Sequence, residues 1–305
     1  MIDFVGNCES ITTLKEVVRK ISVTDVTILV TGENGTGKDL LVQLIRDSSK
    51  RNTKPFVVVN CGAIPYSLAE NEFFGHVKGA YTDAGSDYKG KIGQADGGIL
   101  YLDEVADLDL NLQSKLLRFL QFRVYQQVGS NKEVSADVRV IASTSKDLKS
   151  LVSTGRFRED LYYRLNVVPL FLPPLRDRSG DIDDLAYYFL DKYCKKYVKK
   201  ITFAKSFLFS LQNYTFPGNV RELENIIEKE IVLSDDGVLI DIKHSDRIVT
   251  KTFLTLKEAI DDFKRSYIIK SLDLNGWNQT KTAKTLDIQR TYLARLIKEY
   301  EISKL

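Results

Sequence analysis

A glycine-rich run of seven residues constrains the fold of this chain more than any other feature. It reads Gly-Glu-Asn-Gly-Thr-Gly-Lys at positions 32–38, after an apolar stretch at 27–31 and before a helical pattern at 39–48. Glycines let backbone N–H groups close around phosphate oxygens, and the helix that follows points its positive end at them. This order predicts a P-loop in a parallel α/β sheet. A flexible glycine-rich turn is the alternative.

Two residues at the end of this run carry separate expectations. Lys38 would neutralise the β- and γ-phosphates of a nucleotide. Asp39 stands where the general pattern has the Ser or Thr that holds Mg²⁺. The residues expected to bind the nucleotide here are Gly32, Glu33, Asn34, Gly35, Thr36, Gly37, Lys38 and Asp39.

A second motif, at residues 97–104, reads Gly-Gly-Ile-Leu-Tyr-Leu-Asp-Glu. Its four apolar residues predict a strand buried on both faces, which delivers two carboxylates at the end where α/β sheets bind ligands. Asp103 would hold Mg²⁺, and Glu104 would polarise the attacking water. By itself an Asp-Glu pair after a strand is usually only the start of a helix, because acids suit helix N-termini. Together with the P-loop it predicts an ATP hydrolase.

The apolar pattern divides the chain into an α/β part and helical parts. Pro173-Pro174 ends the alternation of strands and helices, because proline extends neither element. In the helix at 39–48, the apolar face is expected to hold Leu40, Leu41, Leu44 and Ile45. The expected strands lie at 27–31, 56–59, 99–102, 138–143 and 167–171. The expected parts are an α/β core at 1–172, a helical region at 173–238, a linker at 239–253 and a small all-α domain at 254–305.

The last domain has the spacing of a helix-turn-helix. Asn278 suits the N-cap of a helix at 279–285, residues 286–288 form a tight turn, and a second helix follows at 289–300. Its apolar positions are Tyr292, Leu293, Leu296 and Ile297. The second helix would read the major groove of DNA. A helical hairpin used for dimerisation is the alternative, and the upstream helix at 256–272 is expected to supply a dimer face.

Charge supports the DNA-binding interpretation locally, although the formal net charge of the chain is only +3. Between residues 276 and 298, five basic residues accompany one acidic residue, Asp287. The residues expected to contact DNA are Lys281, Arg290, Thr291, Tyr292, Arg295 and Lys298.

Composition excludes several other classes of protein. The three cysteines are far apart, which fits a reducing cytosol better than disulfides or a zinc site. With only two histidines, a His-built metal centre is not expected. The N-terminus has no signal-peptide pattern and no apolar run is long enough to span a bilayer, so we expect a cytoplasmic protein without a membrane partner.

Taken together, the motifs resemble the AAA+ ATPase domain of bacterial sigma-54-dependent transcription activators, the enhancer-binding proteins. The resemblance runs from about Phe4 to Leu233 and more weakly to Leu305, where the tail is similar to Fis-type DNA-bending proteins. The P-loop resembles GESGTGK, and relatives usually carry Glu where this chain has Asp39. Residues 97–104, 157–165, 172–178 and 216–223 resemble GGTLFLDE, FRxDLYYRL, LPPLRxR and WPGNVREL.

The resemblance implies roles for further residues. Arg158 and Arg164 match arginine fingers that reach the ATP of a neighbouring subunit, a task that suits a permanently charged guanidinium. Surface ion pairs are the alternative for these two arginines. Arg221 matches a lid arginine that senses nucleotide in the same subunit. Asn60 matches the asparagine that couples the catalytic Glu to the remodelling loop, and Thr144 lies at the sensor strand, followed by Ser145 where relatives usually have Asn.

A loop that resembles GAFTGA implies the partner. In the family this loop rises from the ring and grips sigma-54 when ATP is bound. Asp83 replaces the second glycine of the pattern, which removes backbone freedom. Nearby His76 is expected to be a structural hydrogen-bonding residue. The residues expected to contact sigma-54 are Gly79, Ala80, Tyr81, Thr82, Asp83 and Ala84.

We therefore expect a DNA-bound ATPase whose dimers assemble into a hexamer-like ring that remodels sigma-54 RNA polymerase at promoters. Two alternatives stay open: a family ATPase with an altered loop that regulates DNA without sigma-54, and a DNA-binding scaffold whose ATP site does not turn over. The family commonly has an N-terminal receiver or ligand-sensing domain. Because Met1 directly precedes the ATPase pattern, we expect control by another protein or by expression level.

Overall fold

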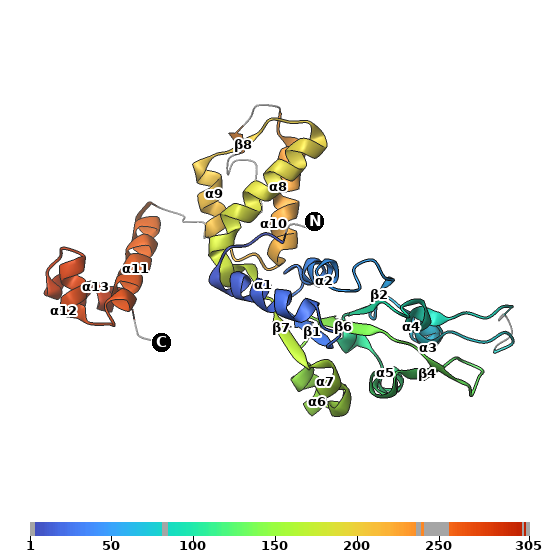
Figure 1. Cartoon of the computed structure of the whole chain (residues 1–305). Coiled ribbons are helices and arrows are strands. Elements are labelled where there is room, and N and C mark those ends of the chain that lie inside the picture. The colour runs from blue at the N-terminus through green and yellow to red at the C-terminus, as the bar shows by residue number, and fades with distance from the viewer. Residues whose placement is uncertain (1–3, 81–84, 236–238, 241–255, 301, 303–305) are drawn as a thin grey trace. The chain divides into compact units, whose positions relative to one another are not determined.

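The fold is known from a computed structural model, which describes residues 4–80, 85–235, 239–240, 256–300 and 302. Two compact units divide the chain, one within residues 1–248 and one within residues 249–305 (Figure 1). Across the described ranges, none of the helices combines the length and the apolar character needed to cross a bilayer.

A five-stranded parallel sheet forms the centre of the first unit, in the order β2-β3-β6-β1-β7 (Figure 1). All five predicted strands are confirmed, with ends that differ by one residue from the prediction. The P-loop strand β1 lies beside β6, and β6 separates it from β3, which ends in Asp103. The strands are β1 Ile28–Thr31, β2 Phe56–Asn60, β3 Ile99–Asp103, β6 Arg139–Thr144 and β7 Val168–Phe171.

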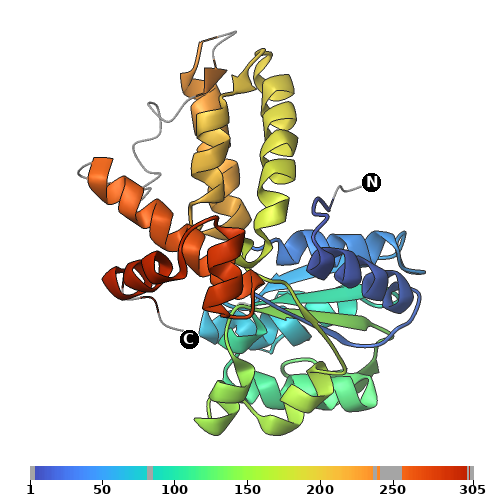
Figure 2. The same ribbon diagram turned by 90° about the vertical axis from the view of Figure 1, so that its left-hand side faces the viewer.

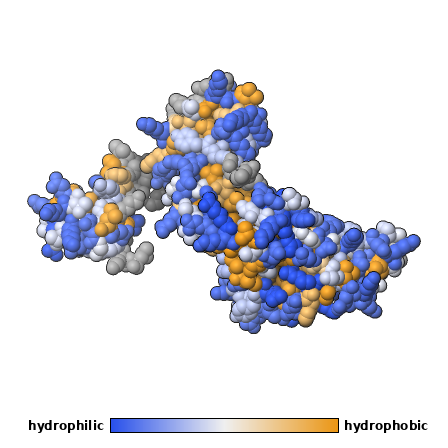
Figure 3. Space-filling view, in the orientation of Figure 1, coloured by the Kyte–Doolittle hydropathy of each residue, from blue (hydrophilic) through white to orange (hydrophobic). Residues whose placement is uncertain are grey.

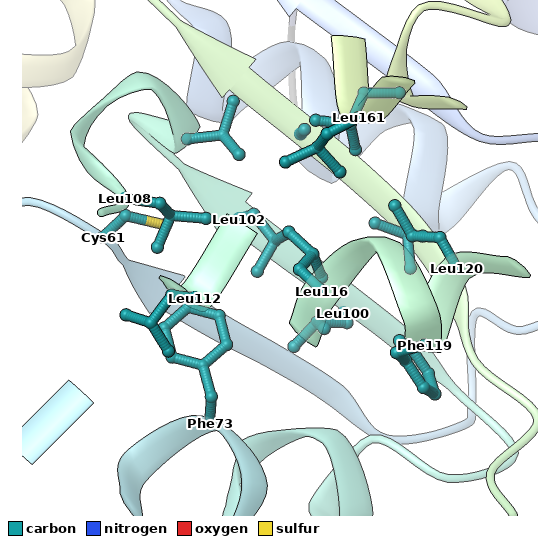
Figure 4. Close-up of a cluster of buried hydrophobic side chains, with 14 of the residues drawn as sticks. Cys61, Phe73, Leu100, Leu102, Leu108, Leu112, Leu116, Phe119, Leu120 and Leu161 are labelled. Atoms are coloured by element: carbon teal, nitrogen blue, oxygen red, sulfur yellow. The ribbon is translucent and has the colours of Figure 1, made fainter. Parts of the chain in front are cut away.

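Helices cover both faces of this sheet, so alternate residues of each strand enter different cores. Ile28 and Val30 pack with α1 (Glu9–Ser22) and α2 (Lys38–Asp47), whereas Leu29 between them faces the opposite core. Figure 4 shows that opposite core, where Leu100 and Leu102 lie close to Leu116. It is closed by α3 Tyr66–Phe74, α4 Gly90–Gln94, α5 Leu110–Phe122, α6 Leu148–Ser153 and α7 Glu159–Leu165.

The prediction for the apolar face of α2 is wrong at one residue, Leu40. Leu40 is 42% exposed, because the buried stripe of this helix runs through Lys38, Leu41, Val42 and Ile45 at helical spacing. Leu40 instead faces a cleft described below. The error arose because five of the six residues at 40–45 are apolar, so this short helix offers two overlapping apolar stripes.

A helical lid follows the sheet in the same unit. The helices α8 (Ile182–Tyr197) and α10 (Asn219–Leu233) lie side by side, as Figures 1 and 2 both show, and enclose their own core around Phe207 and Phe216. The remaining lid elements are the 3-10 helix η2 Leu175–Asp181, the helix α9 Lys205–Gln212, and the strand β8 Thr202–Phe203, which pairs with β9 Leu239–Ile240.

The base of the predicted remodelling loop is closed by backbone pairing. His76 exchanges two hydrogen bonds with Tyr88, of 2.9 and 2.8 Å, and the hairpin of β4 (Val124–Gln126) and β5 (Glu133–Ser135) lies in the same region. The His76 ring lies 2.5 Å from the Asn71 side-chain oxygen, in accordance with a structural role. Gly75 has φ +73°, and a Cβ there would lie 2.0 Å from the Tyr88 carbonyl, so the turn requires glycine.

The described residues of the second unit form the helices α11 (Leu256–Leu274), α12 (Gln279–Thr285) and α13 (Arg290–Glu299). The predicted N-cap is confirmed, because the Asn278 side chain accepts hydrogen bonds from the backbone of Thr280 and Lys281. Asp287, in the turn, has the left-handed φ of +51°. The core contains Ile268, Leu272, Ala283, Leu293, Leu296 and Ile302.

Candidate functional site

A cleft of about 400 Å³ lies at the C-terminal ends of β1 and β3, between the sheet and the lid. Parallel sheets bind ligands at this end, because loops and helix N-termini converge there. The P-loop and the two carboxylates of β3 therefore meet in one place. The cleft is lined by Asn34, Gly35, Gly37, Lys38, Asp39, Leu40, Asn60, Asp103, Glu104, Val220, Arg221 and Glu224.

Close contact with the lid shapes the P-loop. Gly35 has φ +78°, and a Cβ there would lie 2.2 Å from the Gly218 carbonyl, so only glycine fits. The backbone N–H of Arg221 donates to the Gly35 carbonyl at 3.2 Å, while the exposed Arg221 side chain lines the cleft. The lid arginine predicted to sense nucleotide is thus joined to the loop that would hold the phosphates.

Lys38 and Glu104 form an ion pair inside the cleft, with 3.3 Å between Nζ and Oε1. The Lys38 ammonium also donates to the carbonyls of Gly32 and Glu33, at 3.0 and 3.4 Å. The other Glu104 oxygen accepts from the Ser145 backbone at 2.9 Å and from the Ser145 hydroxyl at 3.0 Å. Burial alone would raise the pKa of Glu104, but these hydrogen bonds and the Lys38 charge lower it, so the carboxylate stays ionised.

A network of hydroxyl groups surrounds Asp103. The Ser143 hydroxyl donates to Asp103 Oδ1 at 2.7 Å, and the Tyr101 hydroxyl lies 2.7 Å from Asp39 and 3.2 Å from Asp103. The Asn60 amide donates to Asp103 Oδ2 at 3.4 Å, while the Asn60 oxygen accepts two backbone N–H groups of the following turn. Asn60 thus approaches Asp103 and also fills the turn role that a strand-end asparagine commonly has.

Carboxylate oxygens are the ligands that Mg²⁺ prefers in proteins. Asp103 and Asp39 both present such oxygens beside the P-loop, so the donor set of the cleft fits this ion. Thr144, at the end of β6, lies 3.4 Å from Glu104, and its hydroxyl also accepts the Lys146 backbone N–H.

The lid holds the P-loop through side chains to which sequence analysis assigned no role. The Arg176 guanidinium donates to both carboxylate oxygens of Glu33, at 2.9 and 2.5 Å. Asn219 is fully buried, donates to Glu33 and to the Asn34 carbonyl, and accepts the Leu175 backbone N–H at 2.8 Å. The hydrogen bond from Arg176, with a smaller one from Asn219, lowers the pKa of Glu33 to about 2.

Arg178 adds a third contact from the lid, since its guanidinium donates to the Thr36 carbonyl at 2.8 Å and is buried. Arg176 and Arg178 belong to the run at 172–178, and Asn219 belongs to the run at 216–223. Their positions in the two motifs were visible in the sequence, but nothing in a linear motif tells which loop its side chains contact.

The two predicted arginine fingers, at the N-cap of α7 and in α7, lie outside this cleft. Arg158 is exposed and forms a bidentate pair with Asp160, at 3.0 and 2.8 Å. Arg164 donates to the Leu120 carbonyl at 3.3 and 3.0 Å. The structure therefore does not bring either arginine to the Lys38–Glu104 pair of its own chain.

Exposed hydrophobic side chains occur near both edges of the sheet in this unit. Figure 3 shows hydrophobic residues at several places on the visible surface of the sheet-bearing part. Val58 and Tyr66 are exposed near the edge strand β2, and Val167 and Phe171 are exposed at the other edge, by β7. Two different surfaces of one subunit are thus available for association.

In the second unit, the predicted DNA-contact residues are exposed on α12 and α13. Tyr292, predicted as an apolar position of this helix, is 40% exposed and is not part of the core. Its ring instead supports the Arg295 guanidinium, 5.0 Å from the ring centroid. Thr291, Arg295 and Lys298 follow one another at helical spacing and share one face of α13.

Of the predicted sigma-54 contacts, the structure describes Gly79 and Ala80. Gly79 has φ +82° and nothing would meet a Cβ there within 4 Å, whereas Ala80 packs against Gly129. Tyr81, Thr82, Asp83 and Ala84 lie outside the described residues.

These features define the class of protein: a P-loop α/β domain of the AAA+ type with a helical lid, followed by a helix-turn-helix unit. The family models agree with this order along the chain. The Sigma-54 interaction domain matches residues 4–171, the AAA+ ATPase lid domain matches residues 176–252, and the Fis family of bacterial regulatory proteins matches residues 259–300. The chain belongs to the family of sigma-54-dependent transcription regulators.

Similar proteins include the Nif-specific regulatory protein of Azotobacter vinelandii, 39% identical over 98% of this chain and 59% of its own length. The transcriptional regulatory protein ZraR of Klebsiella oxytoca is 42% identical over 96% of this chain and 68% of its own length. Crystal structures of NtrX from Brucella abortus with ADP and with ATP both superpose with a TM-score of 0.73. They are 32% and 33% identical and match 99% and 98% of this chain, and 70% and 69% of their own. The chain spans about three fifths of the length of its Azotobacter relative.

Proposed function

We propose that this chain binds ATP in the cleft and hydrolyses it to ADP and phosphate. The observation that carries this proposal is the convergence of Lys38, Asp103 and Glu104 in one cleft with the P-loop. The crystal structures of NtrX with ATP and with ADP support nucleotide binding by this fold.

Each of these residues has a chemical task in the proposed reaction. Lys38 leaves Glu104 to contact the phosphates, and Glu104 then takes a proton from the attacking water. The water oxygen bonds to the γ-phosphorus while the bond to the β-phosphate oxygen breaks. Mg²⁺, when bound with ATP, would neutralise charge on the phosphate oxygens, and Asp103 is the residue proposed to hold it. Thr144 and Arg221 are proposed to detect the nucleotide.

We propose that catalysis requires a second copy of the chain. Arg158 and Arg164 do not lie beside the cleft of their own chain. From a neighbouring subunit they could stabilise the charge of the transition state. Apolar side chains are exposed near both sheet edges, which suits a head-to-tail contact between subunits. Such contacts form a ring when the rotation from each subunit to the next adds up to a full turn. Dimers that assemble into a hexamer-like ring would satisfy both observations.

The second unit is proposed to bind double-stranded DNA at enhancer sites. Lys281, Arg290, Thr291, Tyr292, Arg295 and Lys298 would contact bases or phosphates, with α13 in the major groove. A chain ending at Lys251 should keep ATP hydrolysis at high concentration and lose specific DNA binding. Binding by the full chain should weaken steeply with salt, because phosphate contacts release counterions. Specific binding by the shortened chain would refute this assignment.

The ATP-driven ring is proposed to remodel sigma-54 RNA polymerase through the loop at 79–84, with Asn60 linking the cleft to that loop. The test is promoter opening with purified sigma-54 polymerase, with ATP hydrolysis measured on the same preparations. Thr82→Ala should keep hydrolysis and abolish opening, whereas Asp83→Gly, which restores backbone freedom, should leave opening equal or improved. Failure of the unmodified chain to engage sigma-54 would instead favour a sigma-54-independent DNA-binding regulator.

A further inference from the structure

The Tyr101 hydroxyl occupies a position between the two carboxylates that flank the P-loop lysine. It lies 2.7 Å from Asp39 Oδ1, 3.2 Å from Asp103 Oδ1 and 2.9 Å from the Ser143 hydroxyl. Ser143 in turn lies 2.7 Å from the same Asp103 oxygen. One phenolic oxygen therefore connects the first turn of α2 with the ends of β3 and β6.

The strand geometry explains why these groups meet. Tyr101 and Asp103 are two residues apart on β3 and so point to the same face of the sheet. Tyr101 pairs with Ile141 in β6, which places Ser143 beside the end of β3 on that face. The tyrosine ring is only 3% exposed and stacks on Phe56, with ring planes 8° apart, so the hydroxyl has a fixed position.

The hydrogen bonds can be assigned by counting donors. Two hydroxyl hydrogens are available for two carboxylates, since an ionised carboxylate only accepts. Tyr101 donates to Asp39, its shortest contact, and Ser143 donates to Asp103. The hydroxyl groups therefore fix how the two acids face the cleft.

We infer that Tyr101, assisted by Ser143, is a positioning residue that orients Asp39 and Asp103 toward a single divalent cation bound with ATP. This inference rests on the proposed ATP site and adds Asp39 to the surroundings of the metal. Groups that hydrogen-bond to metal ligands fix the ligand orientation, and their loss commonly weakens metal affinity or activity about 10–100-fold. Tyr101 acts only through the two carboxylates.

Tyr101→Phe tests the inference with the loss of one oxygen atom and no change in the packed ring. In the presence of an ATP analogue that is not hydrolysed, we expect the Tyr101→Phe chain to bind Mn²⁺ about tenfold more weakly than the unmodified chain does. Mn²⁺ shares the preference of Mg²⁺ for carboxylate and water ligands and is followed directly by electron paramagnetic resonance. Analogue affinity measured without metal should stay unchanged, because Lys38 and the P-loop are intact.

Tyr125→Phe is the matched control. Tyr125 is also a buried tyrosine of the first unit, but its hydroxyl contacts the Lys89 carbonyl, at 3.5 Å, and does not line the cleft. This variant should bind Mn²⁺ as the unmodified chain does. Ser143→Ala should weaken Mn²⁺ binding as well, because Asp103 loses its shortest hydroxyl donor.

The outcomes separate this inference from the proposed function. Unchanged Mn²⁺ affinity in Tyr101→Phe, with an unchanged melting temperature, would overturn the inference even if the unmodified chain hydrolyses ATP. An equal loss in Tyr125→Phe would do the same, because it would reveal a general effect of removing a buried hydroxyl. A loss of Mn²⁺ affinity in Tyr101→Phe but not in Tyr125→Phe supports the inference even if the unmodified chain fails to hydrolyse ATP. That failure would refute only the proposed turnover.

Discussion

The nucleotide cleft and helix α7 lie in the same unit but hold their charged residues in opposite ways. In the cleft, Lys38 and Glu104 are each bound by several groups, and their side chains are only 8% and 19% exposed. At the start of α7, the N-cap residue Arg158 pairs in solvent with Asp160 in the first turn of the helix. Because solvent screens an exposed pair of this kind, Arg158 is released from Asp160 at little cost. The cleft is thus organised before any ligand arrives, whereas the arginines are available to another molecule.

The largest expected effect tests whether α7 serves a neighbouring cleft. Arg164→Ala should keep ATP binding and lower turnover about 1000-fold, the lower range for an arginine finger. A matched Arg156→Ala, which removes an exposed arginine just before α7, should leave turnover unchanged.

Mixing experiments then decide between subunits. The Arg164→Ala chain has an intact P-loop, and a Lys38→Ala chain has an intact Arg164. Mixed rings should regain part of the activity when ATP turnover is measured. If verified mixed rings stay inactive, the arginine does not act on its neighbour.

A smaller loss is expected inside the cleft itself. Glu104→Gln should retain ATP binding but lower turnover about 100-fold, because the amide cannot take the proton from water. Nucleotide affinity and hydrolysis measured on one preparation decide this. Hydrolysis near the unmodified rate would remove Glu104 from the mechanism.

The motifs of the cleft and the lid contacts that hold the P-loop differ in how well the sequence predicted them. The strands, the P-loop and the Asp103-Glu104 pair followed from local patterns, because strand alternation and loop glycines act within a few residues. The contacts of Arg176, Arg178 and Asn219 with the P-loop join residues more than a hundred positions apart. Periodicity and spacing contain no information about such contacts, which depend on how the lid packs.

The link between lid and cleft predicts a moderate effect on stability. Asn219→Ala should lower the free energy of unfolding by about 1–3 kcal/mol, because the buried Leu175 N–H loses its acceptor. Asn225→Ala, at an exposed position of the same helix, is the control and should have little effect. Denaturant unfolding measures both. Equal stability of the two variants would show that Asn219 does not hold the lid.

A weaker effect is expected from Ser145, which donates to Glu104 Oε2, whereas Lys38 pairs with Oε1. Ser145→Ala removes the hydroxyl donor but keeps the backbone N–H, so turnover should change only a few-fold, by about the worth of one hydrogen bond. Steady-state kinetics with Ser153→Ala, an exposed serine of α6, as control would measure it. A loss as large as that of Glu104→Gln would give Ser145 a direct part in catalysis.

The smallest expected effect concerns acid. Because the pKa of Glu33 is lowered from 4.5 to about 2, its ionised form is favoured by folding. Its contribution to stability is complete above pH 4.5 and disappears as the pH falls toward 2. The difference in melting temperature between the unmodified chain and Glu33→Gln should therefore shrink on acidification. A difference that grows instead would contradict the Arg176 pairing.

The Lys38 ammonium has three N–H groups, and carbonyls or a carboxylate already lie within reach of all of them. To bind this lysine, an incoming phosphate therefore has to displace one of its partners, because all three of its N–H groups are engaged. Such an exchange favours ligands that bring more negative charge than the single carboxylate they displace. A nucleoside without phosphates offers nothing in return, whereas a triphosphate gains most. Selection by phosphate number thus begins with a competition for one ammonium group.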